Sequence, residues 1–302
     1  MSAATQHYDV VILGTGPAGL QAAIHASRKK VSVLVLGKEN KSSLFNAHVE
    51  NFCCLFNVTG ADMIGNGRKQ AAGFGAKFSD ADVLSITPKD NGLELKTEDG
   101  ATIDASALII ATGTHRNRLN VKGEKELTGK GVSYCVDCDG YFYKGQKVAV
   151  VGNESAAADG ALTLTKIAAE VHLVSERLDV STTLKSELDA STVKVHLGRK
   201  VKAIRGDKEV EALELSDGEM MAINGVFIEQ GAKGLLQLAT NLGIQLDDEM
   251  RYIRTDKQQA TNMPGIFAAG DVCGPPWQVA KAVGEGCVAG INAADYAKRV
   301  TK

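Results

Sequence analysis

The sequence G-T-G-P-A-G at residues 14–19 constrains the fold more than any other stretch of the chain. An apolar, β-branched run at 8–13 precedes it directly, and an alanine-rich helical pattern at 20–28 follows it. A glycine-rich loop between a strand and a helix is typical of a dinucleotide-binding fold, because the loop backbone and the helix N-terminus face the pyrophosphate. The residues therefore predict a dinucleotide cofactor, and they leave open whether it is FAD or NAD.

Each position of this loop has its own expected role. Gly14 permits the tight turn, Gly16 lets the backbone approach the pyrophosphate, and Gly19 lets the helix pack on the strand. Pro17, followed by Ala18, suits the first helical turn, where a missing N–H costs nothing.

An acidic residue follows at the expected distance. Glu39 lies twenty residues past Gly19, where a carboxylate can bind a ribose hydroxyl. A solvated loop charge is the alternative explanation for Glu39.

A second strand–loop–helix pattern begins at residue 147. It comprises a strand at 147–151, a loop at 152–157, a helix that extends to Ala169, and a strand at 171–174. With 302 residues and 44% hydrophobic content, two such units predict an α/β protein with two Rossmann-like three-layer domains. Further helices are expected at 60–78 and 278–298, and further strands at 83–86, 93–97, 107–111 and within 193–230.

The pair Cys135 and Cys138 has the spacing of a redox-active C-x-x-C. A zinc half-site would need a second pair with matching spacing, and the chain has none, so we expect no metal. Asp139 follows directly, and its carboxyl group can exchange the proton that a thiol–thiolate pair needs at each turnover. The alternative for Asp139 is an aspartate that caps a turn before Gly140.

Overall composition excludes several classes of protein. The net charge of −2 gives no indication of nucleic-acid or membrane binding, and no apolar run is as long as a membrane span. The polar start of the chain, residues 1–6, lacks the pattern of a secretory signal. We therefore expect a cytoplasmic protein whose cysteines outside the catalytic pair are thiols. The adjacent Cys53 and Cys54 are expected to be small buried residues, with an extra redox relay as the alternative.

Taken together, the motifs of this chain resemble those of the low-molecular-weight thioredoxin reductases over essentially its full length. The resemblance rests on the 14–19 loop, the C-x-x-C-D-G sequence at 135–140, and five further motifs. These are V-E-N-F at 49–52, A-T-G at 111–113, V-K-G-E-K-E-L at 121–127, G-V-S-Y at 131–134 and F-A-A-G-D at 267–271.

The resemblance implies an FAD domain built from residues 1–117 and 243–302, with a central NADPH-type domain at 118–242 that carries the cysteine pair. It implies a homodimer, and it makes Cys138 the flavin-proximal thiol, Cys135 the thiol that attacks a thioredoxin-like partner, and Asp139 the proton donor. The residues expected to bind FAD are Gly14, Gly16, Pro17, Ala18, Gly19, Glu39, Leu44, Asn51, Val83, Ala111, Thr112, Gly113, Gly270, Asp271, Trp277, Gln278 and Val279.

The chain departs from the family in the second glycine loop and just beyond it. Glu154 replaces the glycine at which the backbone should approach a pyrophosphate. The arginine-rich segment that would bind the 2′-phosphate of NADPH is Ser175-Glu176-Arg177 here, and its later arginine is Ser181. Trp277 stands where the family has an arginine near the flavin. We expect it to cover the flavin or stack on a second ring, with a surface or dimer-interface tryptophan as the alternative.

These departures make NADPH binding doubtful and leave several donors open. One possibility is ferredoxin, and another is a second FAD at the vestigial NADPH site. Glu176 would suit NADH, and an ordinary NADPH-dependent enzyme with degenerate motifs is the main alternative. The basic run Arg199, Lys200, Lys202 and Arg205 is either a docking site for an acidic donor or a solvated face. Outside enzymes of this type, a non-catalytic flavin-binding redox sensor and, more weakly, a disulfide-forming oxidase remain alternatives.

Overall fold

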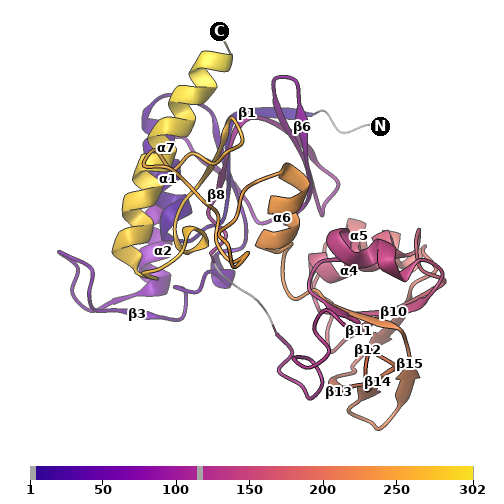
Figure 1. Ribbon diagram of the computed structural model, residues 1–302. Helices are drawn as coiled ribbons and strands as arrows, with labels where there is room; N and C mark the ends of the chain where they lie inside the picture. The colour runs from indigo at the N-terminus through magenta and orange to yellow at the C-terminus, as the bar shows by residue number, and fades with distance from the viewer. Residues whose placement is uncertain (1–4, 114–117, 302) are drawn as a thin grey trace. The chain divides into compact units, whose positions relative to one another are not determined.

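The computed structural model describes residues 5–113 and 118–301, and these form two compact units (Figure 1). The outer unit contains residues 5–97, 101–113 and 238–301, whereas the central unit contains residues 98–100 and 118–237. The predicted two-domain α/β class is confirmed. The exact limits stay a prediction, and the limit at 117/118 adjoins residues 114–117, which lie outside the described residues.

The outer unit is built on a sheet with strand order β5-β2-β1-β8-β7-β6, to which β17 adds by pairing with β8. Strand β1 is parallel to β2 and β8, so that Val10 lies opposite both Val33 and Ala107. The last strands form antiparallel hairpins. The strands are β1 (Gln6–Leu13), β2 (Val33–Leu36), β5 (Lys77–Ser79), β6 (Val83–Lys89), β7 (Gly92–Thr97), β8 (Thr102–Ile110) and β17 (Ile266–Ala268), with a separate ribbon of β3 (His48–Val49) and β4 (Val58–Thr59).

Helices α1 (Pro17–Arg28) and α7 (Val279–Val300) pack together on this sheet, and Figure 1 shows α7, in yellow, lying along α1. Glycines in α7 allow the close approach. A Cβ atom added to Gly286 would lie 2.2 Å from the carbonyl oxygen of Ala18, and one added to Gly290 would lie 2.3 Å from that of Ala22. The remaining helical segments of this unit are α2 (Gly60–Gly73), η1 (Glu39–Lys41) and η3 (Asp271–Cys273), and α6 (Leu235–Leu242) spans the 237/238 limit.

The central unit is built on a parallel sheet with strand order β12-β11-β10-β16-β9. A smaller antiparallel sheet, β13-β14-β15, packs its apolar side chains against residues of the parallel sheet. The strands are β9 (Val132–Ser133), β10 (Lys147–Val151), β11 (Glu170–Ser175), β12 (Lys194–Leu197), β13 (Val201–Arg205), β14 (Ala212–Leu215), β15 (Met220–Ala222) and β16 (Gly225–Ile228). The helical segments are α3 (Val136–Asp139), η2 (Gly140–Tyr143), α4 (Ser155–Leu164) and α5 (Thr182–Asp189).

Two predicted helices are shorter than expected. The helix predicted at 60–78 ends at Gly73, because Gly75 has a φ of 101° and turns the chain, and Phe78 then lies in β5. The helix predicted to extend to Ala169 ends at Leu164, and Ala169 instead donates its N–H to the carbonyl of Gln146 at the start of β10. Tertiary pairing overrides helical propensity at both positions.

Across residues 5–113 and 118–301, no helix combines the length and the apolar character that crossing a membrane requires.

Candidate functional site: a disulfide at the carboxyl edge of the central sheet

Three loops of the central unit meet because they leave parallel strands at the same edge of one sheet. Strand β9 leads into the C-x-x-C segment, β16 leads into Glu229, and β10 leads into the second glycine loop. The carboxyl edge of a parallel sheet is where α/β proteins place their ligands and reactive groups. The topology therefore brings together residues that are about 90 positions apart in the sequence, such as Val136 and Glu229 at a separation of 93.

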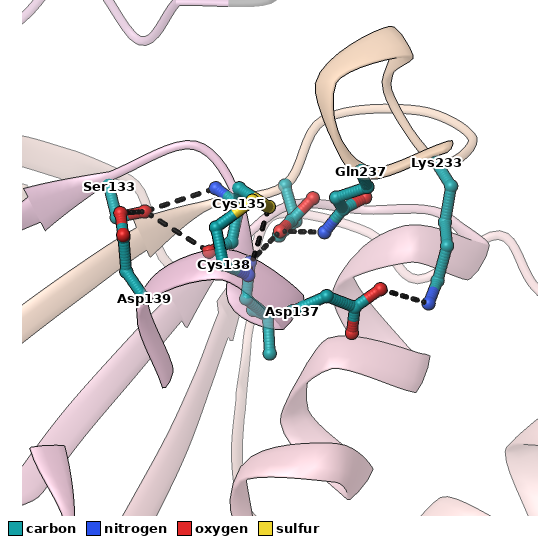
Figure 2. Close-up of a disulfide and its surroundings, with 9 residues drawn as sticks. Ser133, Cys135, Asp137, Cys138, Asp139, Lys233 and Gln237 are labelled. Atoms are coloured by element: carbon teal, nitrogen blue, oxygen red, sulfur yellow. Dashed lines mark hydrogen bonds and ion pairs between the residues drawn. A yellow bond between two sulfur atoms is a disulfide. The ribbon is translucent and has the colours of Figure 1, made fainter. Parts of the chain in front are cut away.

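The two cysteines of the predicted redox pair form a disulfide, with their Cα atoms 5.3 Å apart (Figure 2). Cys135 is only 1% exposed, whereas Cys138 is partly exposed. The N–H of Cys138 points at the Cys135 sulfur at 3.1 Å. Such a donor stabilises negative charge on the sulfur once the bond is reduced.

Asp139 is connected to the pair through Ser133 (Figure 2). The Ser133 hydroxyl donates to the Asp139 carboxylate at 2.6 Å, and the same oxygen accepts the N–H of Cys135 at 3.1 Å. The carboxylate is thus tied to the cysteine loop by a residue that the sequence marked only as part of the 131–134 motif. The role of Asp139 in proton transfer stays a prediction.

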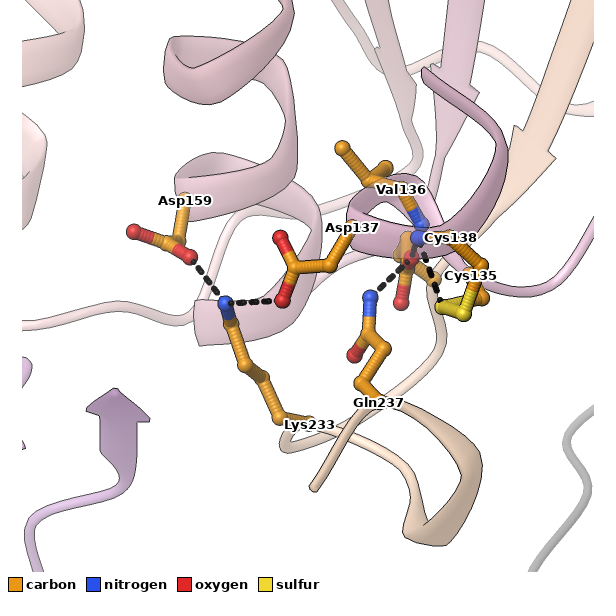
Figure 3. A network of polar contacts seen from close by, with 8 residues as sticks. Cys135, Val136, Asp137, Cys138, Asp159, Lys233 and Gln237 are labelled. Atoms are coloured by element: carbon orange, nitrogen blue, oxygen red, sulfur yellow. Dashed lines mark hydrogen bonds and ion pairs between the residues drawn. A yellow bond between two sulfur atoms is a disulfide. The ribbon is translucent and has the colours of Figure 1, made fainter. Parts of the chain in front are cut away.

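Behind the disulfide lies a polar network that the sequence did not indicate (Figure 3). The Glu229 carboxylate, only 3% exposed, accepts the N–H of Val136 at 3.0 Å and the side-chain N–H of Gln237 at 2.7 Å. Burial raises the pKa of Glu229 to about 8. Nearby, the Lys233 ammonium binds the carboxylates of Asp137 at 3.2 Å and Asp159 at 2.9 Å. Although burial opposes it, these two acids raise the pKa of Lys233.

In the second glycine loop, Gly152 packs against the backbone of a neighbouring loop, and Glu154 occupies the position of the second glycine. A Cβ atom added to Gly152 would lie 1.8 Å from the carbonyl oxygen of Glu229, so this glycine is needed for packing. Glu154 is the N-cap residue of helix α4 and is only 7% exposed. The position that a pyrophosphate would approach therefore carries a buried carboxyl group.

The segment after β11 presents one arginine where a 2′-phosphate site is expected to have several. Glu176 forms an ion pair with Lys200 at 2.9 Å. The hydroxyl of Ser181 accepts the N–H of Leu184 and caps helix α5. Arg177 is exposed and is the one arginine kept from the expected segment.

In the outer unit, the first glycine loop has the shape that a pyrophosphate requires. Gly14 has a φ of 114°, and a Cβ atom there would lie 2.3 Å from the carbonyl oxygen of Ala111. A Cβ atom on Gly19 would lie 2.0 Å from the carbonyl oxygen of Gly14. A Cβ atom added to Gly16 would meet only a side-chain oxygen of Ser42, at 3.3 Å, so no backbone atom covers this glycine. These residues fit the phosphates of FAD, and their role in binding it stays a prediction.

The other predicted FAD ligands lie in the outer unit, and two of them contact each other. The Asn51 amide donates to the Gln278 side chain at 2.8 Å, joining the 49–52 loop to the start of α7. Burial raises the pKa of Asp271; the Lys281 charge opposes this rise and the Glu285 charge adds to it. Three further predicted ligands are buried, namely Leu44, Val83 and Ala111. Strand β8 is followed closely by Thr112 and Gly113. The N–H of Gly270 donates to the Glu285 carboxylate at 2.8 Å.

Glu39 has a protein partner that the sequence did not indicate. Its carboxylate lies 2.6 Å from the Arg68 guanidinium, which also lies over the Phe78 ring at 4.6 Å. A ribose hydroxyl at Glu39 would therefore share this carboxylate with an arginine.

Trp277 is 58% exposed, as either a flavin cover or an interface residue would be. If it covers the flavin, Trp277→Arg should increase the fluorescence of bound FAD and change the rate of its reduction, because a stacked indole is removed. Fluorescence of the purified variant and stopped-flow absorbance measure these two effects. An unchanged flavin spectrum and reduction rate would leave Trp277 as a surface residue.

The remaining cysteines form no disulfide in the described residues. The expectation that Cys53 and Cys54 are buried is wrong: both are exposed, with their sulfur atoms 3.5 Å apart. Cys53 and Cys54 lie in the connection between β3 and β4, where Cys54 has a φ of 68°; Val49 and Phe52 beside them supply the side chains that pack on the core. Burial raises the pKa of Cys273 to about 12, which keeps that residue a protonated thiol.

The basic run after β12 is neutralised by acids of the central unit. Arg199 pairs with Asp217 and Glu219, while Lys202 and Arg205 both pair with Glu214. With Lys200 paired to Glu176, every member of this run has an acidic partner. This arrangement favours a solvated, internally paired face over a docking site for an acidic donor.

The whole chain is similar in sequence and in structure to known disulfide reductases. Residues 8–286 match the family model of pyridine nucleotide-disulphide oxidoreductases. The chain is 36% identical to a thioredoxin reductase of Listeria monocytogenes, with 99% of this chain and 97% of that protein aligned. An atypical thioredoxin reductase from Desulfovibrio vulgaris Hildenborough is similar in structure, with a TM-score of 0.85, 34% identity, and coverage of 98% and 99%. A ferredoxin-flavin thioredoxin reductase from Clostridium acetobutylicum gives a TM-score of 0.71 at 30% identity, with coverage of 99% and 100%.

Proposed function

Since the chain belongs to the pyridine nucleotide-disulphide oxidoreductases and is a flavoenzyme of thioredoxin reductase type, we propose that it reduces a thioredoxin-like protein with electrons from a donor other than NADPH. Ferredoxin is the donor we favour, and a second flavin is the variant of this proposal. We further propose that the protein acts as a homodimer, as the family resemblance implies.

The observation that carries this proposal is the buried Glu154 in the second glycine loop. A nucleotide pyrophosphate needs a glycine there, both for space and to avoid negative charge. Glu176, paired with Lys200, removes the arginine fork that would select a 2′-phosphate. Support also comes from the solved relatives, one of which is an atypical thioredoxin reductase and another a ferredoxin-flavin thioredoxin reductase.

The chemistry uses the Cys135–Cys138 pair as a two-electron relay. When bound, FAD supplies the electron pair that breaks the S–S bond. The resulting Cys135 thiolate attacks the disulfide of the partner, and Cys138 then attacks the mixed disulfide and releases the reduced partner. Asp139 exchanges the accompanying proton, held in place by the Ser133 hydroxyl.

Two alternatives make different demands on the same residues. An ordinary NAD(P)H-dependent reductase would have to tolerate both Glu154 and Glu176 in its nucleotide site. A non-catalytic redox sensor would have no need for a proton-transfer group beside the cysteines, so the Ser133–Asp139 pair favours the enzyme.

An anaerobic titration of the oxidised protein tests the donor. We expect reduced ferredoxin to bleach the flavin absorbance, and NADPH and NADH at the same concentration to leave it unchanged. Rapid bleaching by NADPH would mean that the loop accepts a nucleotide despite its acids. If a reduced viologen bleaches the flavin but no thioredoxin is reduced, the protein is a sensor instead of a reductase.

A further inference from the structure

The turn that carries the redox cysteines is held from behind by a buried acid. Glu229 follows β16 and accepts the N–H of Val136, the residue directly after Cys135, at 3.0 Å. The Gln237 amide donates to the same carboxylate oxygen at 2.7 Å. Both the carboxylate and the Cys135 sulfur therefore accept N–H groups of the same short helical turn, α3.

Within residues 5–113 and 118–301, the carboxylate of Glu229 forms no ion pair. The Lys233 ammonium acts on Glu229 through its charge, but its side chain is only 9% exposed and it already binds Asp137 and Asp159. One positive charge is thus shared by three acids. Ionised Glu229 beside Cys135 would repel a thiolate formed there, because like charges in a poorly hydrated site interact strongly.

The Gln237 side chain can also form a hydrogen bond with the protonated form of Glu229. This side chain is 2% exposed, and its carbonyl oxygen is buried with no hydrogen-bond donor among the described residues. A half-turn of the amide exchanges its N–H and C=O ends. Gln237 can therefore donate to a carboxylate or accept from a carboxylic acid, so both protonation states of Glu229 find a partner.

We propose that Glu229 is a positioning residue of the redox centre that holds the cysteine turn through Val136 and takes up a proton when the disulfide is reduced. Two electrons from the reduced flavin break the S–S bond, and one solvent proton yields one thiol and one thiolate. A second solvent proton converts the Glu229 carboxylate to the carboxylic acid. On reoxidation by the partner disulfide, both protons return to solvent. The inference rests on the proposed function, since it assumes that the pair cycles between disulfide and dithiol.

The groups that face Glu229 set the pH window of this uptake. They are the N–H of Val136 and the carboxylate of Asp137 on α3, the Lys233 ammonium in the loop before α6, and the Gln237 amide on α6; Lys233 in turn binds Asp159 on α4. In the oxidised protein the pKa of Glu229 is raised to about 8. A thiolate raises it further, so Glu229 takes up its proton above pH 8 and is already protonated in both redox states well below that value.

The test measures the midpoint potential of the Cys135–Cys138 pair against pH, on the full flavin-containing chain. The protein is equilibrated in oxidised and reduced dithiothreitol, alkylated, and analysed by mass spectrometry of the peptide with both cysteines. Above pH 8, we expect the wild-type potential to fall more steeply than that of Glu229→Gln. The difference is up to about 30 mV per pH unit, the equivalent of a tenfold change for a two-electron couple. Below that range, the two curves should meet.

Glu214→Gln is the matched control, because it removes a largely buried, paired carboxylate from the small antiparallel sheet of the same unit. Its curve should follow the wild type. Equal slopes for wild type and Glu229→Gln, or one constant offset at every pH, would overturn the proposal and leave Glu229 as a structural residue.

Infrared difference spectra keep the proposal testable if Glu229→Gln does not fold. Reduction of the wild type above pH 8 should produce a protonated-carboxyl C=O band that shifts in Gln237→Leu. Absence of that band, or a band that Gln237→Leu leaves in place, would contradict proton uptake at Glu229. Because dithiothreitol is the reductant, a wrong donor leaves these results unaffected. A pair that never exchanges with dithiothreitol would instead refute the redox function itself.

Discussion

Cys138→Ser should abolish thioredoxin reduction while leaving bound FAD in place. Reduction of a disulfide partner needs two thiols, and a single Cys135 can form a mixed disulfide but cannot resolve it. Loss of a residue that forms the reactive centre removes roughly three orders of magnitude of activity or more. FAD is retained because the glycine loop with the shape of a pyrophosphate site lies in the outer unit, whereas Cys138 lies in the central unit.

Thioredoxin-coupled turnover with a reduced viologen as donor measures this effect, and the flavin-to-protein absorbance ratio measures FAD retention. Cys287→Ser is the control, because it removes a free thiol of α7 in the outer unit and should keep full activity. If Cys138→Ser kept full turnover, the assignment of the redox pair would be wrong.

Glu154→Gly should strengthen NADPH binding on the order of a hundredfold. One carboxylate about 5 Å from a phosphate charge costs roughly 3 kcal/mol at an effective dielectric constant near 20. That free energy corresponds to about two orders of magnitude in the dissociation constant. The change also removes the side chain where a pyrophosphate would approach the backbone.

Isothermal titration calorimetry of each variant with NADPH distinguishes the electrostatic effect of Glu154 on the affinity from its steric effect. Glu154→Gln removes only the charge and should recover most of the affinity, whereas Glu154→Gly should recover slightly more. Glu187→Gln makes the same change in net charge at an exposed site of α5 and should behave as wild type. Tight NADPH binding by the wild type, unimproved by either change, would contradict the loss of the nucleotide site.

Local sequence by itself determined the fold class and the chemical identity of the redox centre. The 14–19 loop, the repeated strand–loop–helix pattern and the Cys135–Cys138 spacing depend on residues that are close in the chain. Backbone conformation and cysteine spacing are local properties, so the positive φ of Gly14, the approach of Gly19 to Gly14 and the disulfide could be anticipated, whereas the approach of Gly14 to Ala111 could not. The departure at Glu154 was visible for the same reason.

Only the tertiary structure decided which distant side chains surround that centre. Glu229, Lys233 and Gln237 reach the cysteine turn because β9, β10 and β16 are parallel neighbours whose carboxyl ends share one edge. The same kind of long-range contact paired Glu39 with Arg68. Contacts of this kind have no local pattern in the sequence. Burial, which raises the pKa of Glu229 to about 8, is likewise set by how the whole unit packs.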